Sequence, residues 1–155
     1  MNREDRFFAA VAARKLVRPS VRSIVIGARG FLVQRPTDAP HVSYAFIGGE
    51  YELGDTFEER LRKEFEEETS ARVVWSEYRF VVENRFLWNG RLVQTLEHYF
   101  EVRLDRDDIA SNEPHLEQVW LPLAEFAAAD VRPKVVRDAL AQGNWGEIRR
   151  LVVEL

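Results

Sequence analysis

Asn89-Gly90 separates two long runs of β-branched and aromatic residues, and this arrangement predicts a β-hairpin. The runs are residues 78–88 (YRFVVENRFLW) and 91–104 (RLVQTLEHYFEVRL). An Asn-Gly pair readily adopts the positive φ angles of a type I′ turn, whose twist matches that of two antiparallel strands. We therefore expect a long two-stranded ribbon, against which the rest of the chain must pack.

Shorter elements lie on both sides of this ribbon. Upstream, apolar runs at 23–28, 31–35 and 42–47 are typical of strands, and the last of them leads into Gly48-Gly49. The glycine pair marks a place where the backbone can bend or approach a ligand closely. Downstream, a strand is predicted at 118–123.

Helices are predicted from apolar periodicity and from the residues at their ends. An N-terminal helix at 3–16 ends before Pro19, and a late helix at 131–143 has Pro133 in its first turn and Gly143 past its end. The tail at 145–155 fits either a helix or a strand. Together these elements predict one α/β domain over residues 1–155, with a mixed sheet and flanking helices.

Charge and composition exclude several classes of protein. The chain has 155 residues, a net charge of −4 and no cysteine. Without a basic face it lacks the footprint of a nucleic-acid or anionic-membrane binder, and without thiols it has neither disulfides nor thiolate metal sites. The apolar run at 7–13 is too short to span a membrane and follows Glu4 and Asp5, unlike a signal peptide. We therefore expect a cytoplasmic protein.

A central helix carries an unusual cluster of glutamates. Thr56 followed by Glu59 predicts a capping box, and Phe57, Leu61 and Phe65 form one apolar stripe. At about 100° per residue, Glu68 lies about 20° from this stripe and Glu64 about 60°, whereas Glu66 lies about 140° away, toward solvent. Glu67 lies on the flank nearer to Glu64.

Two inward carboxylates at i and i+4 repel each other and are costly to bury without a positive partner. With no cysteine, and with His41, His98 and His115 scattered, an oxygen-rich cluster suits Mg²⁺ or Mn²⁺. Two alternatives remain open at this point. The glutamates form an ordinary solvated face, or they pair with nearby cations; those cations are Arg60, Arg62 and Lys63.

Residues 48–71, GGEYELGDTFEERLRKEFEEETSA, resemble the Nudix box. Gly49 opens the pattern, Glu64, Glu67 and Glu68 supply its acidic core, and the spacing needs no gap. The chain departs from the pattern at a few supporting positions: Asp55 replaces Glu, Lys63 replaces Arg, Ser70 replaces Gly, and Ile47 stands where a proline often precedes the glycines.

The resemblance extends over roughly residues 20–140 and implies the Nudix α/β/α sandwich, with residues 1–19 as a helical extension. It implies a metal-dependent hydrolase of a nucleoside diphosphate derivative such as ADP-ribose, a nucleotide sugar, a dinucleoside polyphosphate or a nucleoside triphosphate. Glu64, Glu67 and Glu68 would bind the metals with help from the Gly49 carbonyl. Some members take the general base from the loop before the late strand, where Glu113 and Glu117 are the candidates. Related enzymes are often dimers, so a homodimer is an open alternative.

Several other side chains have two interpretations. Arg35 would contact a phosphate or form a surface ion pair, and Trp88, beside the hairpin turn, is expected to be exposed and to stack on a ligand or partner. Trp75 and Trp120 are expected in the core, and Asn84 and His98 as hydrogen-bonded polar residues of the ribbon. The departures at Asp55, Lys63 and Ser70 favour an alternative function, a nucleotide-binding or regulatory module with weak catalysis.

Overall fold

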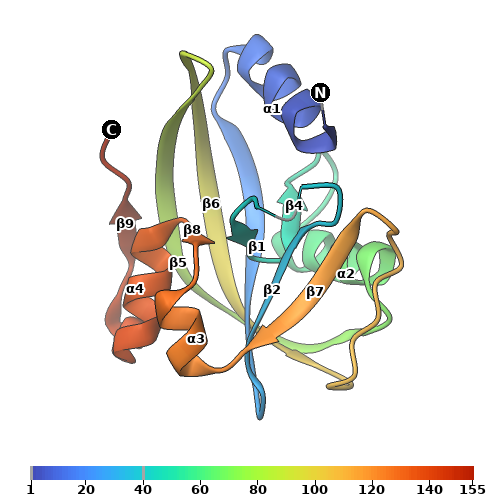
Figure 1. Ribbon diagram of the computed structural model, residues 1–155. Coiled ribbons are helices and arrows are strands. Elements are labelled where there is room, and N and C mark those ends of the chain that lie inside the picture. Colours follow the sequence, from blue (N-terminus) through green and yellow to red (C-terminus); the bar gives the residue numbers. More distant parts are fainter. Residues whose placement is uncertain (1, 40) are drawn as a thin grey trace.

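The computed structural model describes residues 2–39 and 41–155. Its strands form one curled mixed sheet in the order β8-β3-β2-β1-β6-β5-β9, with β4 paired to β1 and β7 to β2 (Figure 1). The strands are β1 (Arg18–Gly27), β2 (Gly30–Pro36), β3 (Tyr44–Ala45), β4 (Gly48–Glu50), β5 (Val73–Trp88), β6 (Arg91–Leu104), β7 (Leu116–Leu121), β8 (Val131–Arg132) and β9 (Arg150–Val152). The helices are α1 (Arg3–Arg14), α2 (Phe57–Glu68), α3 (Leu123–Ala128) and α4 (Lys134–Gln142), followed by a 3-10 turn at Trp145–Glu147.

The predicted hairpin is the longest pairing in the sheet. Strands β5 and β6 run antiparallel from Val73 opposite Leu104 to Trp88 opposite Arg91. Asn89 and Gly90 have φ angles of 48° and 74°, as a type I′ turn requires. Strand β5 starts at Val73, before the predicted run, and its register shifts near each end of the added segment.

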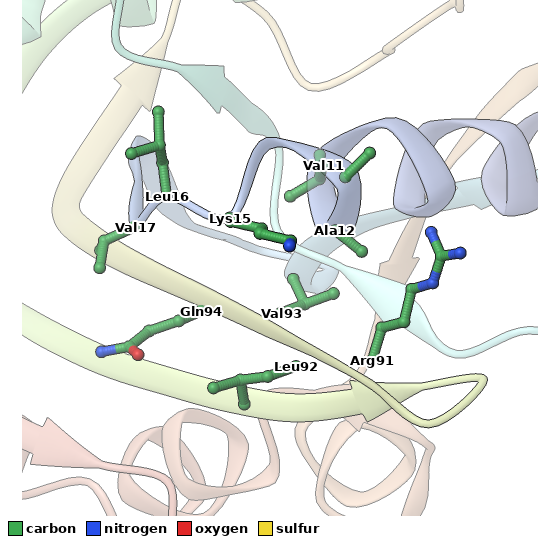
Figure 2. Close-up of a pocket in the computed structure, with 10 residues that line it drawn as sticks. Val11, Ala12, Lys15, Leu16, Val17, Arg91, Leu92, Val93 and Gln94 are labelled. Carbon is green, nitrogen blue, oxygen red and sulfur yellow. The ribbon is translucent and has the colours of Figure 1, made fainter.

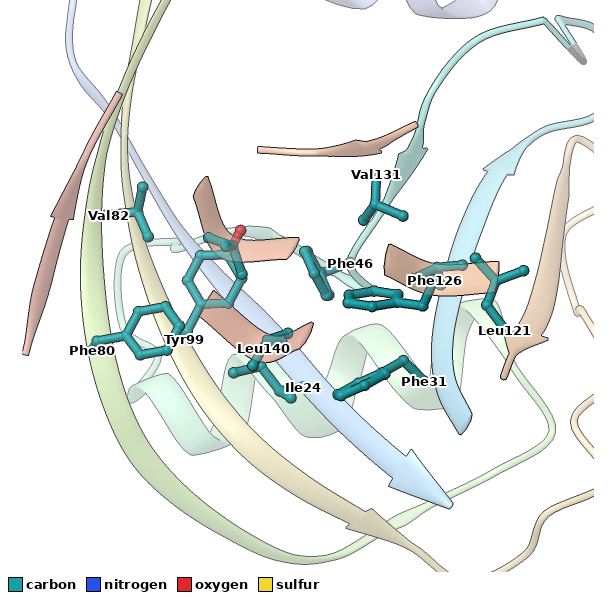
Figure 3. Close-up of a cluster of buried hydrophobic side chains, with 12 residues drawn as sticks. Ile24, Phe31, Phe46, Phe80, Val82, Tyr99, Leu121, Phe126, Val131 and Leu140 are labelled. Atoms are coloured by element: carbon teal, nitrogen blue, oxygen red, sulfur yellow. The ribbon is translucent and has the colours of Figure 1, made fainter. Parts of the chain in front are cut away.

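Different helices cover the two faces of the sheet. On one face, Leu61 and Phe65 of α2 pack with Val21, Val25 and neighbouring side chains. On the other, α3 and α4 pack against alternate residues of the same strands, including Ile24 (Figure 3). Because successive residues of a strand face opposite sides, one strand such as β1 serves both cores. The predicted α/β/α sandwich with a mixed sheet is confirmed.

The glycine pair lies in a strand rather than at a bend. Only Tyr44–Ala45 of the predicted strand 42–47 is a strand, and Gly48–Glu50 forms β4, antiparallel to β1. A Cβ at Gly48 would lie 1.9 Å from the carbonyl oxygen of Val21, so close strand contact requires glycine there. The close approach at Gly48 is therefore to the backbone of β1, and the prediction of a bend was wrong.

Several predicted boundaries were wrong. Strand β1 begins at Arg18 and pairs in parallel with β6, although Pro19 lacks the N–H that a ladder position usually donates. Residues 131–132 form β8, so Pro133 is the N-cap of α4 and does not lie in its first turn. The predicted glycine end is confirmed, since Gly143 has a φ of 82°. The ambiguous tail forms the 3-10 turn and β9, which runs parallel to β5.

Helix α1 covers the end of the hairpin. A capping box joins Asn2 and Asp5, and Val11 and Ala12 pack on Val93. Trp88 also packs against this cluster and is half-buried, so the expectation of an exposed ring was wrong because α1 covers it.

Trp75 and Trp120, both expected in the core, differ from each other. Trp75 is 37% exposed, with the Arg103 guanidinium 4.7 Å from its ring centroid, so its expected core position was wrong. Trp120 packs beside the α2 core and donates its indole N–H to the Asp107 carbonyl at 2.9 Å. Among the described residues, no helix is both long and apolar enough to cross a membrane.

Candidate metal and active site

Helix α2 presents the glutamate cluster, and its N-terminus forms as predicted. The Glu59 N–H donates to Thr56 Oγ1 at 3.2 Å, and the Thr56 N–H donates to Glu59 Oε2 at 3.2 Å. Leu61 and Phe65 are 0% exposed, which fixes the rotation of the helix on the sheet. The inward and outward glutamates are therefore set by the packing of this apolar stripe.

Glu64 lies directly against the backbone of Gly49. A Cβ added at Gly49 would lie 2.1 Å from Glu64 Oε1 and 2.4 Å from its Cδ. The Glu64 side chain is only 12% exposed. The glycine therefore provides the space in which an inward carboxylate rests beside the main chain.

Glu68 lies beside Glu64, one turn further along the helix. Its Oε2 is buried and has no hydrogen-bond partner in the part of the chain that the structure describes, while the carboxyl interacts with Gln34 and Glu64. Burial and then the charge of Glu64 raise the pKa of Glu68 to about 7. Burial also raises the pKa of Glu64, although Arg60 opposes that shift. A buried acid pair with one unpartnered oxygen is an environment that a cation would stabilise.

The other two glutamates face outward to different extents. Glu66 is exposed, as the helical angles predicted. Glu67 is 62% exposed along its side chain and lies 3.6 Å from an Arg60 nitrogen. The three glutamates assigned to metal thus divide into a buried pair and an exposed third member.

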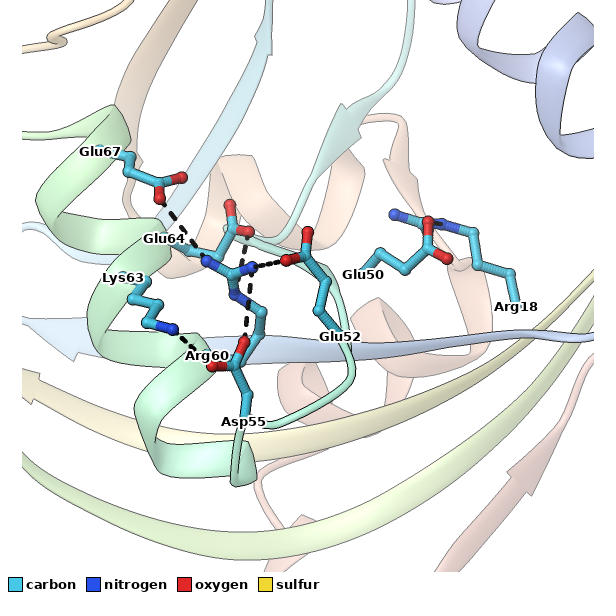
Figure 4. Close-up of polar contacts among 8 residues, drawn as sticks. All are labelled: Arg18, Glu50, Glu52, Asp55, Arg60, Lys63, Glu64 and Glu67. Atoms are coloured by element: carbon cyan, nitrogen blue, oxygen red, sulfur yellow. Dashed lines mark hydrogen bonds and ion pairs between the residues drawn. The ribbon is translucent and has the colours of Figure 1, made fainter.

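Arg60 occupies the centre of the acidic cluster (Figure 4). The residue is 4% exposed, and its guanidinium lies 3.0 Å from Glu52 and 3.6 Å from each of three other carboxylates. Those three belong to Asp55, Glu64 and Glu67. The alternative of pairing to nearby cations is therefore realised for Arg60.

The departures from the family pattern have visible structural consequences. Lys63 donates to the buried carboxylate of Asp55, so the shortened acid and the substituted base still contact each other. Ser70 follows a C-cap, Thr69, whose φ of −134° is extended, so this helix end does not need glycine. Instead, Ser70 exchanges two hydrogen bonds with Ala110, one through its N–H and one through its Oγ.

A loop before β7 is attached to the end of α2. The Asn112 N–H donates to the Glu68 carbonyl at 2.8 Å, and its side-chain amide donates to Thr69 at 2.6 Å and to Glu66 at 3.2 Å. Glu113 follows Asn112 in the sequence, so these hydrogen bonds hold the Glu113 backbone near the end of α2.

Glu117 is engaged elsewhere. It lies opposite Arg35 in the β2–β7 pairing and forms an ion pair with it. The Arg35 guanidinium also lies 4.9 Å from the Tyr44 ring centroid. Of the two expectations for Arg35, the structure shows an ion pair, and a phosphate contact stays a prediction.

The donor set fits a hard cation in part. Glu64 and Glu68 provide buried carboxylate oxygens of the kind that Mg²⁺ and Mn²⁺ prefer. Among the residues that the structure describes, however, no three acidic or histidine side chains converge closely enough to hold a metal ion. Arg60 lies against Glu64 and Glu67, two of the three carboxylates assigned to metal.

Concave surfaces elsewhere do not include these glutamates. A hollow of about 730 Å³ lies between α1 and β6, where Figure 2 shows Val11, Leu16 and Val93 around it. A second, of about 510 Å³, is lined by residues from the β1–β2 turn and the region around α4. Neither hollow is lined by a residue of the acidic cluster.

Sequence reasoning missed some members of the cluster. Gln34 of β2, 7% exposed, interacts with Glu68, and no local pattern linked the two. Arg22 of β1 lies near enough to Glu64 and Glu68 to favour their charged forms. The central role of Arg60 was visible in principle, because Glu64 and Glu67 follow it by four and seven residues on one helical face.

Comparison with known sequences gives one family match. A family model described as the NUDIX domain matches residues 16–140. A search of curated protein sequences found no match.

Solved structures share the fold at low sequence identity. A MutT protein from Methanosarcina mazei Go1 is 19% identical with a TM-score of 0.66, covering 83% of this chain and 93% of that one. A MutT protein from Bacillus halodurans is 16% identical with a TM-score of 0.67, covering 87% and 86%. An ADP-ribose pyrophosphatase from Streptococcus suis is 11% identical with a TM-score of 0.63, covering 89% and 100%.

Proposed function

The chain belongs to the Nudix family of hydrolases, and we propose that it is a divalent-metal-dependent enzyme that cleaves the diphosphate linkage of a nucleoside diphosphate derivative. The observation that carries the proposal is the largely buried pair of Glu64 and Glu68 beside Gly49, in which one oxygen of Glu68 has no hydrogen-bond partner among the described residues. A helix that served only to pack would gain nothing from two inward acids.

Glu64 and Glu68, with the Gly49 carbonyl, would hold Mg²⁺ or Mn²⁺, and Glu67 would complete the set from the solvent side. When bound, such a cation neutralises diphosphate oxygens and lowers the pKa of a bound water. Gln34 steadies Glu68 from β2, and the Gly49 backbone restricts the position of Glu64. These contacts orient the ligands before a substrate arrives.

One carboxylate must stay free to accept the proton of the attacking water, and some family members take it from the loop before the late strand. Glu113 is our candidate, because the Asn112 contacts hold its loop on α2. Glu117 is the weaker candidate, because it pairs with Arg35. Among the basic residues, Arg35 and Arg22 are candidates for contacting the phosphates. Trp88 is half-buried against the cluster of Val11, Ala12 and Val93, which supports a packing role over stacking on a ligand.

The substrate class is a small-molecule nucleotide. The net charge of −4 supports this choice over a nucleic acid or an anionic membrane as partner, and the lack of cysteine supports a cytoplasmic location. The names of the similar structures, MutT and ADP-ribose pyrophosphatase, indicate which substrates to test first. A homodimer remains to be tested by sedimentation.

Substitution of the buried acids tests the proposal. Glu64→Gln and Glu68→Gln keep side-chain volume but remove the charge, and we expect each to lower turnover at least about 100-fold, since metal ligation depends on that charge. The matched control is Glu66→Gln, the same change on the exposed side of the helix. Turnover would be measured in Mg²⁺ and Mn²⁺ with ADP-ribose, nucleotide sugars, dinucleoside polyphosphates and nucleoside triphosphates. Equal turnover in all four proteins would contradict these assignments.

The Arg60 contacts favour a second candidate function. The Arg60 guanidinium already pairs with Glu64 and Glu67, two of the proposed metal ligands. A site in which these ligands stay paired with arginine would bind a nucleotide but catalyse weakly. Calorimetry that shows nucleotide binding, combined with no product after hours in Mg²⁺ or Mn²⁺, would support this candidate. Multiple turnover would exclude it.

A further inference from the structure

The Arg60 guanidinium is enclosed by acids from two segments of the chain. Glu52 and Asp55 belong to the loop before α2, while Glu64 and Glu67 lie on the next two turns of the helix itself (Figure 4). The side chain is 5% exposed, and its Nε has no hydrogen-bond partner within the described residues. Arg60 is thus a buried cation surrounded by carboxylates at ion-pair distances.

Arg60 is not required to neutralise Asp55. Asp55, which is 6% exposed along its side chain, already pairs with Lys63. Its distance to Arg60 is the longer of its two contacts. The contacts left for Arg60 to make alone are those to Glu52, Glu64 and Glu67, and the last two are proposed metal ligands.

We propose that Arg60 is an internal counter-cation that competes with divalent metal for Glu64 and Glu67, so that metal binds only when the guanidinium gives up these two carboxylates. The inference rests on the proposed function, because it concerns the same ligands. It adds that Arg60 sets the metal concentration at which the site becomes occupied. Glu68, which has no Arg60 contact among the described interactions, stays available as the first ligand.

If Arg60 instead supports the metal ligands, its removal should change metal affinity in the opposite direction. The box has Lys63 where the family pattern has arginine, and Arg60, one turn earlier, also contacts Asp55. If Arg60 replaced the lost guanidinium as a support, it would hold Glu64 and Glu67 in position for the metal. Removing it would then weaken metal binding, whereas removing a competitor strengthens it.

Arg60→Met is the decisive variant. Methionine is unbranched, favours helix and fills apolar space without charge. The matched control is Arg62→Met, which removes the same charge from the exposed side of the same helix. Any difference between the two variants therefore reports the local contacts and not the net charge.

Metal affinity would be measured by calorimetric titration of the chelator-treated full chain with Mn²⁺ alone at pH 8, above the pKa of about 7 of Glu68. We expect Arg60→Met to bind Mn²⁺ at least about tenfold more tightly than the unmodified chain, because a metal ligand set gains affinity when a competing cation leaves. Arg62→Met should stay within about twofold, as expected for an exposed charge. An affinity of Arg60→Met that is unchanged or weaker would overturn the proposal.

Thermal unfolding provides a second readout. A ligand that binds only the folded state raises Tm according to its concentration relative to its Kd. At one fixed Mn²⁺ concentration, Tm should rise more for Arg60→Met than for the unmodified chain. If the methionine variant does not fold, Arg60→Gln also removes the charge but keeps a hydrogen-bonding amide, and it should bind Mn²⁺ more tightly than the unmodified chain. Unchanged or weaker binding by Arg60→Gln would overturn the proposal.

The failure of this inference is distinguishable from failure of the proposed function. An unmodified chain that turns over substrate, with equal Mn²⁺ affinity in Arg60→Met, would retain the function and remove the role of Arg60. If neither chain bound Mn²⁺ or turned over substrate, the metal-dependent function itself would be wrong. If only Arg60→Met bound Mn²⁺, the competition would be confirmed and the unmodified chain would be a weak catalyst.

Discussion

At Gly49, the absence of a side chain decides where a carboxylate rests. A Cβ at position 49 would lie 2.1 Å from Glu64 Oε1. The φ of Gly49 is not among the positive values found for Gly30, Gly54, Gly90 and Gly143, so the requirement for glycine is one of space and not of backbone conformation. Gly49 and Glu64 therefore act as a pair, although 14 residues separate them in the sequence.

Gly49→Ala should uncouple activity from stability. The added methyl would displace a flexible carboxylate, so we expect a fall in Tm of only about 2–4 °C, as for a loss of about 1 kcal/mol in a domain of this size. Turnover should fall at least about tenfold, because a ligand moved by about 1 Å no longer aligns with its partners.

The control for this change is Gly146→Ala. A Cβ at Gly146 would meet no atom within 4 Å, and its φ is not positive, so both Tm and turnover should stay close to those of the unmodified chain. Full activity of Gly49→Ala would show that Glu64 does not need its present position.

At the scale of elements, α2 was the most predictable part of the chain, because its signals are local. The Thr56–Glu59 box, the apolar stripe and the outward direction of Glu66 follow from residues within one helix. Strand β8 was not predictable, since it is two residues long and pairs with β3 from a distant part of the chain. The attachment of the loop at 110–112 to the end of α2 is another long-range feature without a local signal.

Asn112→Ala tests that attachment. The substitution removes two donors to carbonyls at the C-terminal end of α2, those of Glu66 and Thr69. We expect a loss of about 1–2 kcal/mol in the free energy of unfolding, as for other lost helix-end hydrogen bonds. If the loop also delivers Glu113 as the base, kcat should fall more than the Mn²⁺ affinity changes.

Asn144→Ala is the matched control, because Asn144 precedes the 3-10 turn and makes no side-chain capping bond. Chemical denaturation would measure the free energy of unfolding of both variants. Equal stability of Asn112→Ala and the unmodified chain would show that these two hydrogen bonds do not hold the loop.

At the scale of the whole molecule, the sequence predicted the sandwich but not which surfaces it covers. The predicted strands and helices indicated a mixed sheet with flanking helices, and the resemblance to the Nudix box added the expectation of helices on both faces, which the structure has. Burial of Trp88 and exposure of Trp75 depend on whether another element lies over each ring, which a strand pattern does not contain. The same limit applies to Arg60, whose four acidic neighbours come together only after the loop and α2 pack.

Metal-dependent product formation tests the central claim most directly. The purified chain, stripped of metal with a chelator, would be incubated with ADP-ribose and the other nucleotide substrates, and the products separated by chromatography. We predict no turnover without metal, and multiple turnovers after addition of Mg²⁺ or Mn²⁺, with both products of diphosphate cleavage in equal amounts. No turnover of any substrate at millimolar metal, or turnover that persists with the chelator present, would contradict the account.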